Sequence, residues 1–467
     1  DWLKHTGVIA LVDIEESFLL VTLFYFLVTL GILVAVHEFG HFWVARKLGV
    51  KVLTFSIGFG RPLFQRTDAS GTRYVLAAIP LGGFVSMLDE REAEVAPELQ
   101  KHAFNRQSLW ARAAIILAGP MANFLLAIAV YWAVSVIGVQ GYQPVVGEIS
   151  SGSAAERAGL FSDQLIVAID GKPVQSRAQV NMALLQRVGD TGKIDIATSM
   201  HGSNVANSHS LDIERWLSDS EMQAPSTALG FEFWQPEWPA IIDKVVAGQA
   251  AAKAGLLSGD KLVVIAGQPV AVWQDAVELI RTSPNQALNI EIERDGARQP
   301  IQLTPAAHSL ASGEIVGRIG VSVALPEMPA NMQVLVRSGI VDGLWVASKE
   351  TVSMIAFTLN SIKKMLAGLI STDNLSGPVT IAKIASASAA SGLTPYLQFL
   401  ALISISLGVI NLLPIPVLDG GQLVMLGAEA VTGKPLPERV MQFVQQVGLM
   451  LILSIMALAL YNDFTRL

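Results

Sequence analysis

Four long apolar segments divide the chain and decide the prediction of its fold. They cover Phe18–Phe42, Ala113–Val139, Leu393–Leu418 and Val440–Asn462, with Glu38 as the single charged residue inside them. A helix of each length crosses the ~30 Å hydrocarbon core of a bilayer. The pattern predicts a polytopic α-helical membrane protein in contact with a lipid bilayer, with four transmembrane helices. We place these helices at residues 17–45, 109–139, 393–419 and 439–462.

The loop between the first two spans, residues 46–108, carries its own pattern. Two apolar, β-prone stretches at 52–60 and 74–85 flank a polar turn, which predicts a membrane-associated β-hairpin. The hairpin either dips into the bilayer, where protein or a wet cavity satisfies its backbone, or rests on the membrane surface. A free edge there would accept an extended peptide as an added strand, with Gly58 and Gly60 as candidate contacts.

A soluble-looking section follows the second span, and it contains an internal repeat. The stretch Val145–Val174 aligns without gaps with Ile241–Val270, including Ala-Gly-Leu in both copies. We therefore predict two small domains, at 140–234 and 235–328, inserted between spans two and three. Each copy is expected to end in a short glycine-containing strand, Leu229-Gly230-Phe231 and Ile319-Gly320-Val321.

Helical periodicity returns before the third span, at residues 336–371. Apolar and charged positions there separate onto two faces, which predicts an amphipathic helix lying on the membrane interface. Residues 1–16 are mixed in polarity and begin without Met. We leave this N-terminal segment unassigned.

The distribution of lysine and arginine orients the spans. Loop 46–108 is rich in both residues, several of them close to the membrane ends. The positive-inside rule makes this loop cytoplasmic and puts both termini and the inserted domains on the outer side.

Composition narrows the possible chemistry. Hydrophobic residues make up 52% of the chain and charged residues 15%, and there is no cysteine. A metal site here must therefore use histidine and carboxylate ligands. The net charge of −7 includes no basic stripe, so nucleic acid is not an expected partner.

The candidate chemistry begins with His37-Glu38-Phe39-Gly40-His41, at the end of the first span. Positions i and i+4 share one helix face, so His37 and His41 would present two imidazoles to one point. Such a pair forms half of a zinc site, and Glu38 is placed to deprotonate a water there. Two unrelated core histidines are the alternative. Ionisable residues at membrane depth are costly and usually functional, which favours the site.

The third span ends in the stretch Asn411-Leu412-Leu413-Pro414-Ile415-Pro416-Val417-Leu418-Asp419. The two prolines cannot continue a regular helix, so the chain must unwind there. Span counting brings Asp419 to the depth and side of His37 and His41. Its carboxylate would complete a three-ligand site for one zinc ion, with one position left open. Asn123 in the second span either steadies this site or joins two helices.

These motifs together resemble the site-2 protease family of intramembrane zinc metalloproteases. The motif at 37–41, the Asn411–Asp419 stretch and the inserted repeats carry the resemblance, which covers residues 18–467. The inserted units look like bacterial PDZ domains of the circularly permuted kind. The resemblance implies zinc bound by His37, His41 and Asp419, with Glu38 as the catalytic base.

The same resemblance implies the substrate side of the site and its setting. It implies that Asn411, Pro414 and Pro416 shape a substrate groove. Expected substrates are single-span proteins already cut on the outer side, such as an anti-sigma factor, and remnant signal peptides. The setting would be the bacterial inner membrane, with proteolysis serving an envelope stress response. The PDZ units would either capture a peptide terminus or exclude bulky substrates.

Two other classes of function remain open on the residues alone. A non-catalytic membrane scaffold with a vestigial motif would bind no metal, although Glu38 and Asp419 are both intact. A metal transporter would need a polar path through the membrane, yet the apolar segments Ala113–Val139 and Val440–Asn462 contain no acidic or basic residue. Zinc content and peptide cleavage would separate the three classes.

Overall fold

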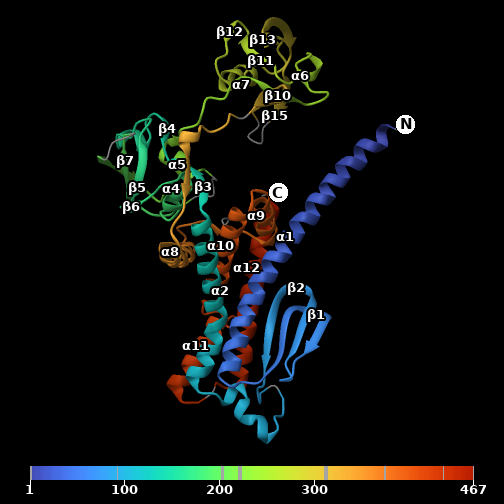
Figure 1. The fold of residues 1–467 in the computed structure, drawn as a ribbon, viewed down its shortest axis with the longest axis vertical. Coiled ribbons are helices and arrows are strands. Elements are labelled where there is room, and N and C mark those ends of the chain that lie inside the picture. Colours follow the sequence, from blue (N-terminus) through green and yellow to red (C-terminus); the bar gives the residue numbers. More distant parts are fainter. Residues whose placement is uncertain are drawn as a thin grey trace.

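Four helices run side by side through the centre of the molecule (Figure 1). The computed structural model describes residues 3–465 apart from 92, 201–204, 219–222, 310–313, 325, 373–374 and 435. Among these residues, four helices are long and apolar enough to cross a membrane, which confirms the predicted number. They are α1 (Leu3–Lys47), α2 (Leu109–Ile137), α10 (Leu393–Leu412) and α12 (Glu438–Thr465). Most of segment 1–16 is thus helical, and residues 1 and 2 lie outside the described part.

Close backbone approach joins α1 to α2. A Cβ atom added to Gly40 would lie 2.2 Å from the carbonyl oxygen of Ala118, so no larger residue fits there. Small residues at such crossings allow tight van der Waals packing inside a membrane. A second contact uses α10, where Ser404 donates a hydrogen bond of 2.8 Å to the backbone oxygen of Asn123. Helix α2 therefore lies between α1 and α10.

Strands β1 (Val52–Thr67) and β2 (Arg73–Met87) follow α1 and form an antiparallel hairpin. Both strands bend, because Gly58 and Gly60 adopt φ angles of +91° and +87° in the middle of β1. The first half of β1 consequently pairs with both halves of β2. The pairing gives a four-stranded ribbon whose edges are residues 83–87 and 62–67. The first of these edges lies beside α1 (Figure 1).

The two repeat units have the same strand order and separate hydrophobic cores. Each has a four-stranded antiparallel sheet, ordered β6-β5-β7-β8 in the first unit and β12-β11-β13-β14 in the second. The first unit contains β4 (Val146–Ile149), α3 (Ala154–Arg157), β5 (Leu165–Ile169), β6 (Lys172–Pro173), α4 (Arg177–Leu185), β7 (Gly192–Ser199), β8 (Ala206–Ile213), α5 (Pro225–Leu229) and β9 (Phe231–Phe233). The second contains β10 (Ile242–Val245), α6 (Ala250–Lys253), β11 (Lys261–Ile265), β12 (Gln268–Pro269), α7 (Trp273–Arg281), β13 (Leu288–Arg294), β14 (Ala297–Leu303), β15 (Ala306–Ser309), β16 (Ile315–Arg318) and β17 (Val321–Val323).

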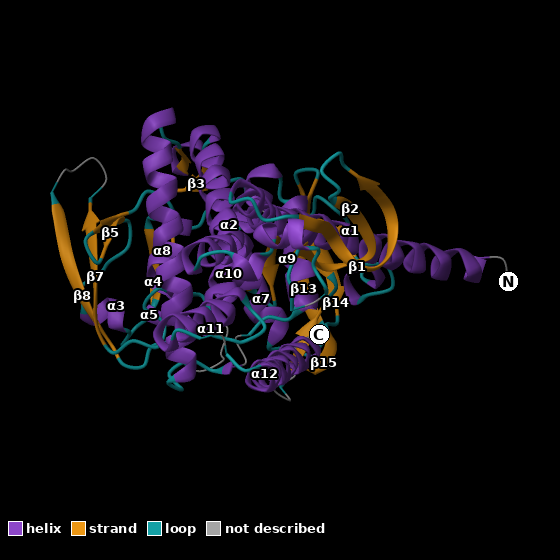
Figure 2. Ribbon diagram, turned by 90° about the horizontal axis from the view of Figure 1, so that it is seen from below, coloured by secondary structure: helices purple, strands orange, loops and turns teal. Residues whose placement is uncertain are grey.

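The chain enters and leaves this section through one paired element. Strand β3 (Val139–Tyr142), after α2, pairs with β18 (Gln333–Val336), which precedes α8 (Ile340–Leu366). Helix α8 is seen end-on in Figure 1 and lengthwise in Figure 2, so it lies crosswise to the spanning helices. Lys364 of α8 donates to Asp190 of the first unit at 2.6 Å, which holds that unit against the helix.

Short helices complete the fold on either side of α10. These are α9 (Pro378–Ala390) and α11 (Asp419–Thr432), with 3-10 turns at Pro97–His102, Phe104–Arg106 and Ala330–Met332. Asp463 of α12 accepts hydrogen bonds from the backbone N–H groups of Gly377 and Val379 at 2.9 and 2.8 Å. This carboxylate satisfies free N–H groups at the start of α9 and ties α12 to it.

Candidate metal centre

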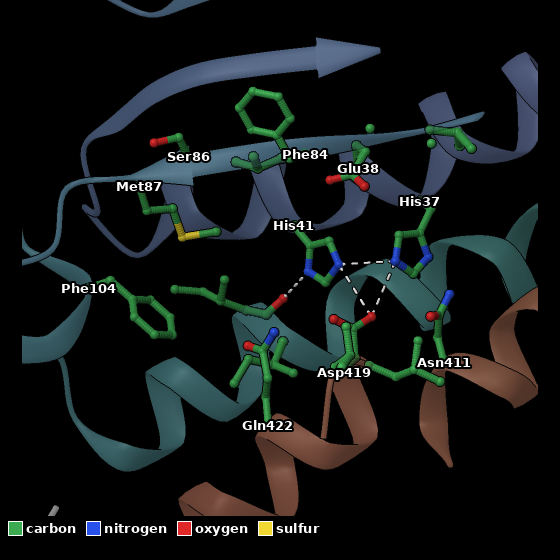
Figure 3. A pocket seen from close by; sticks show the side chains of 18 of the residues that line it. His37, Glu38, His41, Phe84, Ser86, Met87, Phe104, Asn411, Asp419 and Gln422 are labelled. Atoms are coloured by element: carbon green, nitrogen blue, oxygen red, sulfur yellow. Dashed lines mark hydrogen bonds and ion pairs between the residues drawn. The ribbon is translucent and has the colours of Figure 1, made fainter. Parts of the chain in front are cut away.

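Helix α1 brings its two histidines together in the way their spacing predicts. The Nε2 atoms of His37 and His41 lie 3.2 Å apart, and both side chains are buried. The regular helix produces this arrangement, because residues four apart stack on one face. No loop has to move for the two nitrogens to meet (Figure 3).

Helix α2 fixes the orientation of both rings. His41 Nδ1 donates to the backbone oxygen of Ile115 at 2.8 Å, which leaves Nε2 with its lone pair. The Nδ2 atom of the Asn123 side chain lies 3.2 Å from His37 Nδ1. If the amide nitrogen and oxygen exchange positions, the oxygen takes this place and accepts the Nδ1 proton. Asn123 is fully buried, and its amide oxygen has no hydrogen-bond partner among the described residues, which favours the exchanged orientation. Partners of this kind set the tautomer of metal-binding histidines.

Asp419 reaches the histidines from a different part of the chain. Helix α10 ends at Leu412, and α11 begins at Asp419, so the segment with Pro414 and Pro416 lies between two helices. The Oδ2 atom of Asp419 lies 3.2 Å from His37 Nε2 and 3.5 Å from His41 Nε2. Three donor atoms from two elements therefore meet at one point (Figure 3).

The spacing of these three atoms fits a tetrahedral metal. Zinc bonds of about 2.0–2.1 Å in a tetrahedron put neighbouring donor atoms about 3.4 Å apart. The three separations here, 3.2, 3.2 and 3.5 Å, match that value. Asp419 Oδ2 is buried and has no hydrogen-bond donor among the described residues. Facing lone pairs without a shared proton repel one another, and a cation between them removes the conflict.

A cavity of about 890 Å³ opens beside the three donor atoms, and Glu38 lines it. Strand β2 forms one wall, because residues 82–87 also line the cavity. Gly83 packs tightly there, since an added Cβ would lie 2.9 Å from Glu38 Cγ. Figure 3 shows the Glu38 carboxylate between this strand and the histidines. A side chain so placed can exchange a proton with a molecule in the cavity.

The other residues singled out from the sequence fall in several places. Asn411 lines the cavity, whereas Asn123 contacts His37. The cavity lining includes Phe59 but neither of its glycine neighbours, Gly58 and Gly60, which bend β1 instead. Pro414 and Pro416 are also missing from the lining, although Val417 and Leu418 belong to it.

The expected strand at the end of the first unit is shorter than predicted. Leu229 is the last residue of α5, Gly230 takes a left-handed conformation, and β9 begins at Phe231. The prediction of a strand from Leu229 was therefore wrong, because Gly230 ends a helix there. The second unit likewise turns at Gly320 (φ +78°) before β17 begins at Val321. Leu229, Phe231 and Ile319 all have their side chains in the domain cores.

Sequence reasoning missed three contributors to this region. Ile115 acts through its backbone, so its sequence gives no signal. Residues 83–85 were within the predicted stretch 74–85, and β2 continues to Met87. Which strand edge faces the site depends on tertiary packing. Arg112 and Glu429 form an ion pair at 2.6 Å between α2 and α11, away from the three donor atoms. A charged residue ten positions after Asp419, in an otherwise apolar stretch, is a sequence signal that points to this pair.

Comparison with known proteins gives a uniform picture. The model of Peptidase family M50 matches residues 25–455. The regulator of sigma E protease of Salmonella typhi is 43% identical over 442 residues, which cover 95% of this chain and 98% of the relative. The regulator of sigma-E protease RseP of Escherichia coli K12 is 42% identical over the same shares. A Vibrio cholerae relative described as a zinc metalloprotease is also 42% identical over these shares.

Proposed function

Because the chain belongs to Peptidase family M50, the site-2 proteases, and is a zinc metalloprotease, we propose that His37, His41 and Asp419 hold its zinc ion. The observation that carries this proposal is the triangle of three buried donor atoms at 3.2, 3.2 and 3.5 Å. The chain is a bacterial membrane protein, since four apolar helices accompany the similarity to bacterial proteases.

Glu38 is the catalytic base in this proposal. When bound, zinc supplies a Lewis acid that polarises a peptide carbonyl and lowers the pKa of a water. Glu38 accepts a proton from the attacking water while the new C–O bond forms. It then delivers the proton to the departing amide nitrogen as the C–N bond breaks. His41 and Ile115 keep the ring orientation constant throughout, through their 2.8 Å hydrogen bond.

The substrate binds as an added strand along residues 83–87. One side of this segment pairs with the first half of β1, and the other side faces the cavity. A transmembrane helix hides its amide bonds inside hydrogen-bonded turns, so it must unwind before hydrolysis. An open strand edge compensates the lost hydrogen bonds. Asn411, which lines the opposite part of the cavity, holds the extended backbone, and the segment with Pro414 and Pro416 shapes the groove.

Substrates are single-span membrane proteins that have already been cut on the outer side. An anti-sigma factor fits this description, as do remnant signal peptides, and the relatives named as regulators of sigma-E support an envelope stress role. The loop 46–108 and the site lie toward the cytoplasmic face of the inner membrane, by the positive-inside rule. Both termini and the repeat units lie on the periplasmic side, with α8 on the interface.

The two repeat units act as PDZ domains that exclude bulky substrates. Both units lie at one end of the helix bundle, and α11 lies toward the other (Figure 1). A substrate with a large outer domain would collide with them before its span reached the cavity. Capture of a peptide terminus near Gly230 or Gly320, between Leu229 and Phe231 or Ile319 and Val321, is the competing mode. Cleavage that falls with outer-domain size, without inhibition by free C-terminal peptides, supports exclusion; inhibition by such peptides supports capture.

A crosslinking experiment tests the substrate site. A photoreactive residue replaces Phe84 in the full chain carrying Glu38→Gln, and a matched probe replaces Phe64, which is 63% exposed on the opposite strand edge. A single-span substrate is expected to crosslink at Phe84 and not at Phe64. Equal crosslinking at both edges, or crosslinking at Phe64 alone, contradicts the proposed strand addition.

A further inference from the structure

A partly buried ion pair joins α2 to the helix that begins with Asp419. Arg112 donates to Glu429 through both terminal nitrogens, at 3.0 and 2.6 Å. The Arg112 side chain is 10% exposed and that of Glu429 21%. Bidentate pairs of this kind fix direction as well as distance, because the planar fork of arginine matches the carboxylate.

Helix α11 needs such an anchor. The chain before it is not helical between Leu413 and Leu418, so α10 does not impose a direction on α11. Among its described residues, only Gly420, Gly421 and Leu426 are buried. A helix with so little buried side-chain surface is weakly held by apolar packing. The first turn of α11 packs closely against the preceding segment at Gly420 and Gly421. The charged contact at Glu429 holds the far end of the helix.

Helix α2 already orients the other two donor residues. It contacts His41 through the oxygen of Ile115 and His37 through Asn123. Arg112 lies one turn before Ile115 on this helix. The pair with Glu429 thus fixes α11 to α2, the same helix that orients both histidines.

We propose that the Arg112–Glu429 pair is a positioning device for the third metal ligand. It holds α11 at the angle at which Asp419 meets His37 and His41, and it acts from about 15 Å along the helix, ten residues at 1.5 Å each. Neither member touches the donor atoms. The inference rests on the proposed ligand set, and it assigns to these two residues a role in metal affinity rather than in the chemical step.

Zinc affinity of the full chain in lipid nanodiscs tests the inference. The zinc dissociation constant is measured by competition with a fluorescent chelator, and the melting temperature of the zinc-free protein is recorded beside it. Glu429→Gln is expected to weaken zinc binding about 10-fold to 100-fold, the range for partners that orient metal ligands. Arg112→Lys keeps the charge without the fork and should weaken it less. The exchanged pair, Arg112→Glu with Glu429→Arg, should recover part of the loss.

A matched control comes from the second repeat unit. Arg294 contacts Asp260 in the same bidentate way, at 2.6 and 2.7 Å, and Asp260 is 1% exposed. Asp260→Asn removes a comparable pair away from the site, so the zinc dissociation constant should stay within about threefold of that of the unmodified chain.

Asp419→Asn separates this inference from the proposed function. If Asp419→Asn leaves zinc affinity unchanged, the ligand set is wrong. If it weakens zinc while Glu429→Gln and Arg112→Lys do not, only the positioning role is wrong. Equal weakening by Asp260→Asn, or no recovery in the exchanged pair, also overturns the positioning role.

Discussion

The two halves of the proposed metal centre are built in opposite ways. His37 and His41 occupy one face of a regular helix of 45 residues, and the helix alone brings their nitrogens within 3.2 Å. Asp419 stands at the start of a separate helix, after a segment that two prolines keep from being helical. The first half is therefore specified locally and the second by tertiary contacts. Perturbing α1 should displace a ligand directly, whereas perturbing α11 should act through helix position.

The largest expected effect concerns the chemical step rather than either half of the centre. Glu38→Gln preserves shape but cannot accept a proton, so hydrolysis of a single-span substrate should fall by about 10²–10⁴-fold. Zinc content should remain that of the unmodified chain, because Glu38 is not among the three donor residues. Turnover and bound zinc are measured on the same nanodisc preparation. Retained turnover would remove Glu38 from the mechanism.

A substitution in α2 can perturb the histidine half of the proposed site. A Cβ atom on Gly119 would lie 2.2 Å from His41 Nε2, so Gly119→Ala must displace the ring. We expect zinc affinity to fall about 10-fold to 100-fold, as for other displaced ligands. Gly31→Ala is the control, because an added Cβ there meets nothing within 4 Å. A Gly119→Ala variant with unchanged zinc affinity would show that α2 does not constrain His41.

A substitution at the start of α11 can perturb the aspartate half of the proposed site. A Cβ on Gly421 would lie 2.2 Å from the oxygen of Ile415, and backbone cannot move aside as a side chain does. Gly421→Ala should shift α11 and destabilise the protein by about 1–3 kcal/mol, with a smaller loss of zinc affinity than in Gly119→Ala. Gly427→Ala on the same helix has open space and serves as control. Melting temperature and zinc affinity together test this; a loss of affinity greater than in Gly119→Ala would reverse the comparison.

The smallest expected effect is a dependence on pH confined to the aspartate half. The hydrogen bonds from Arg112 hold the pKa of Glu429 below its usual value of 4.5. A lowered folded-state pKa contributes stability above the unfolded pKa, and that contribution is lost as pH falls through the folded value. The melting temperature of the zinc-free chain should thus fall by about 2 °C when the medium is acidified below pH 4.5, and Glu429→Gln should lack this part of the fall. An identical acid dependence in both proteins would contradict this.

The same contrast explains how much the sequence could predict. The spacing of His37 and His41 is enough to place them together, since helical geometry is local. The apolar run before Asp419 predicted its depth, and the matching strand order of the two units follows from their repeated sequence. Local pattern could not decide that Asn123 contacts His37, because that contact depends on how two helices cross. Nor could it show that Gly230 ends a helix, since the same residues also fit a strand.

Zinc K-edge X-ray absorption of the full chain tests the central claim most directly. The account predicts two imidazoles and oxygen ligands at about 2.0–2.1 Å, with no sulfur ligand. In Asp419→Asn, zinc binding should weaken and the fraction of chains carrying this signature should fall. In Gly31→Ala the spectrum should be unchanged, because the added methyl group meets nothing within 4 Å. A spectrum with three or more imidazoles, or one that Asp419→Asn leaves unaltered at full zinc content, would contradict a site shared between α1 and α11.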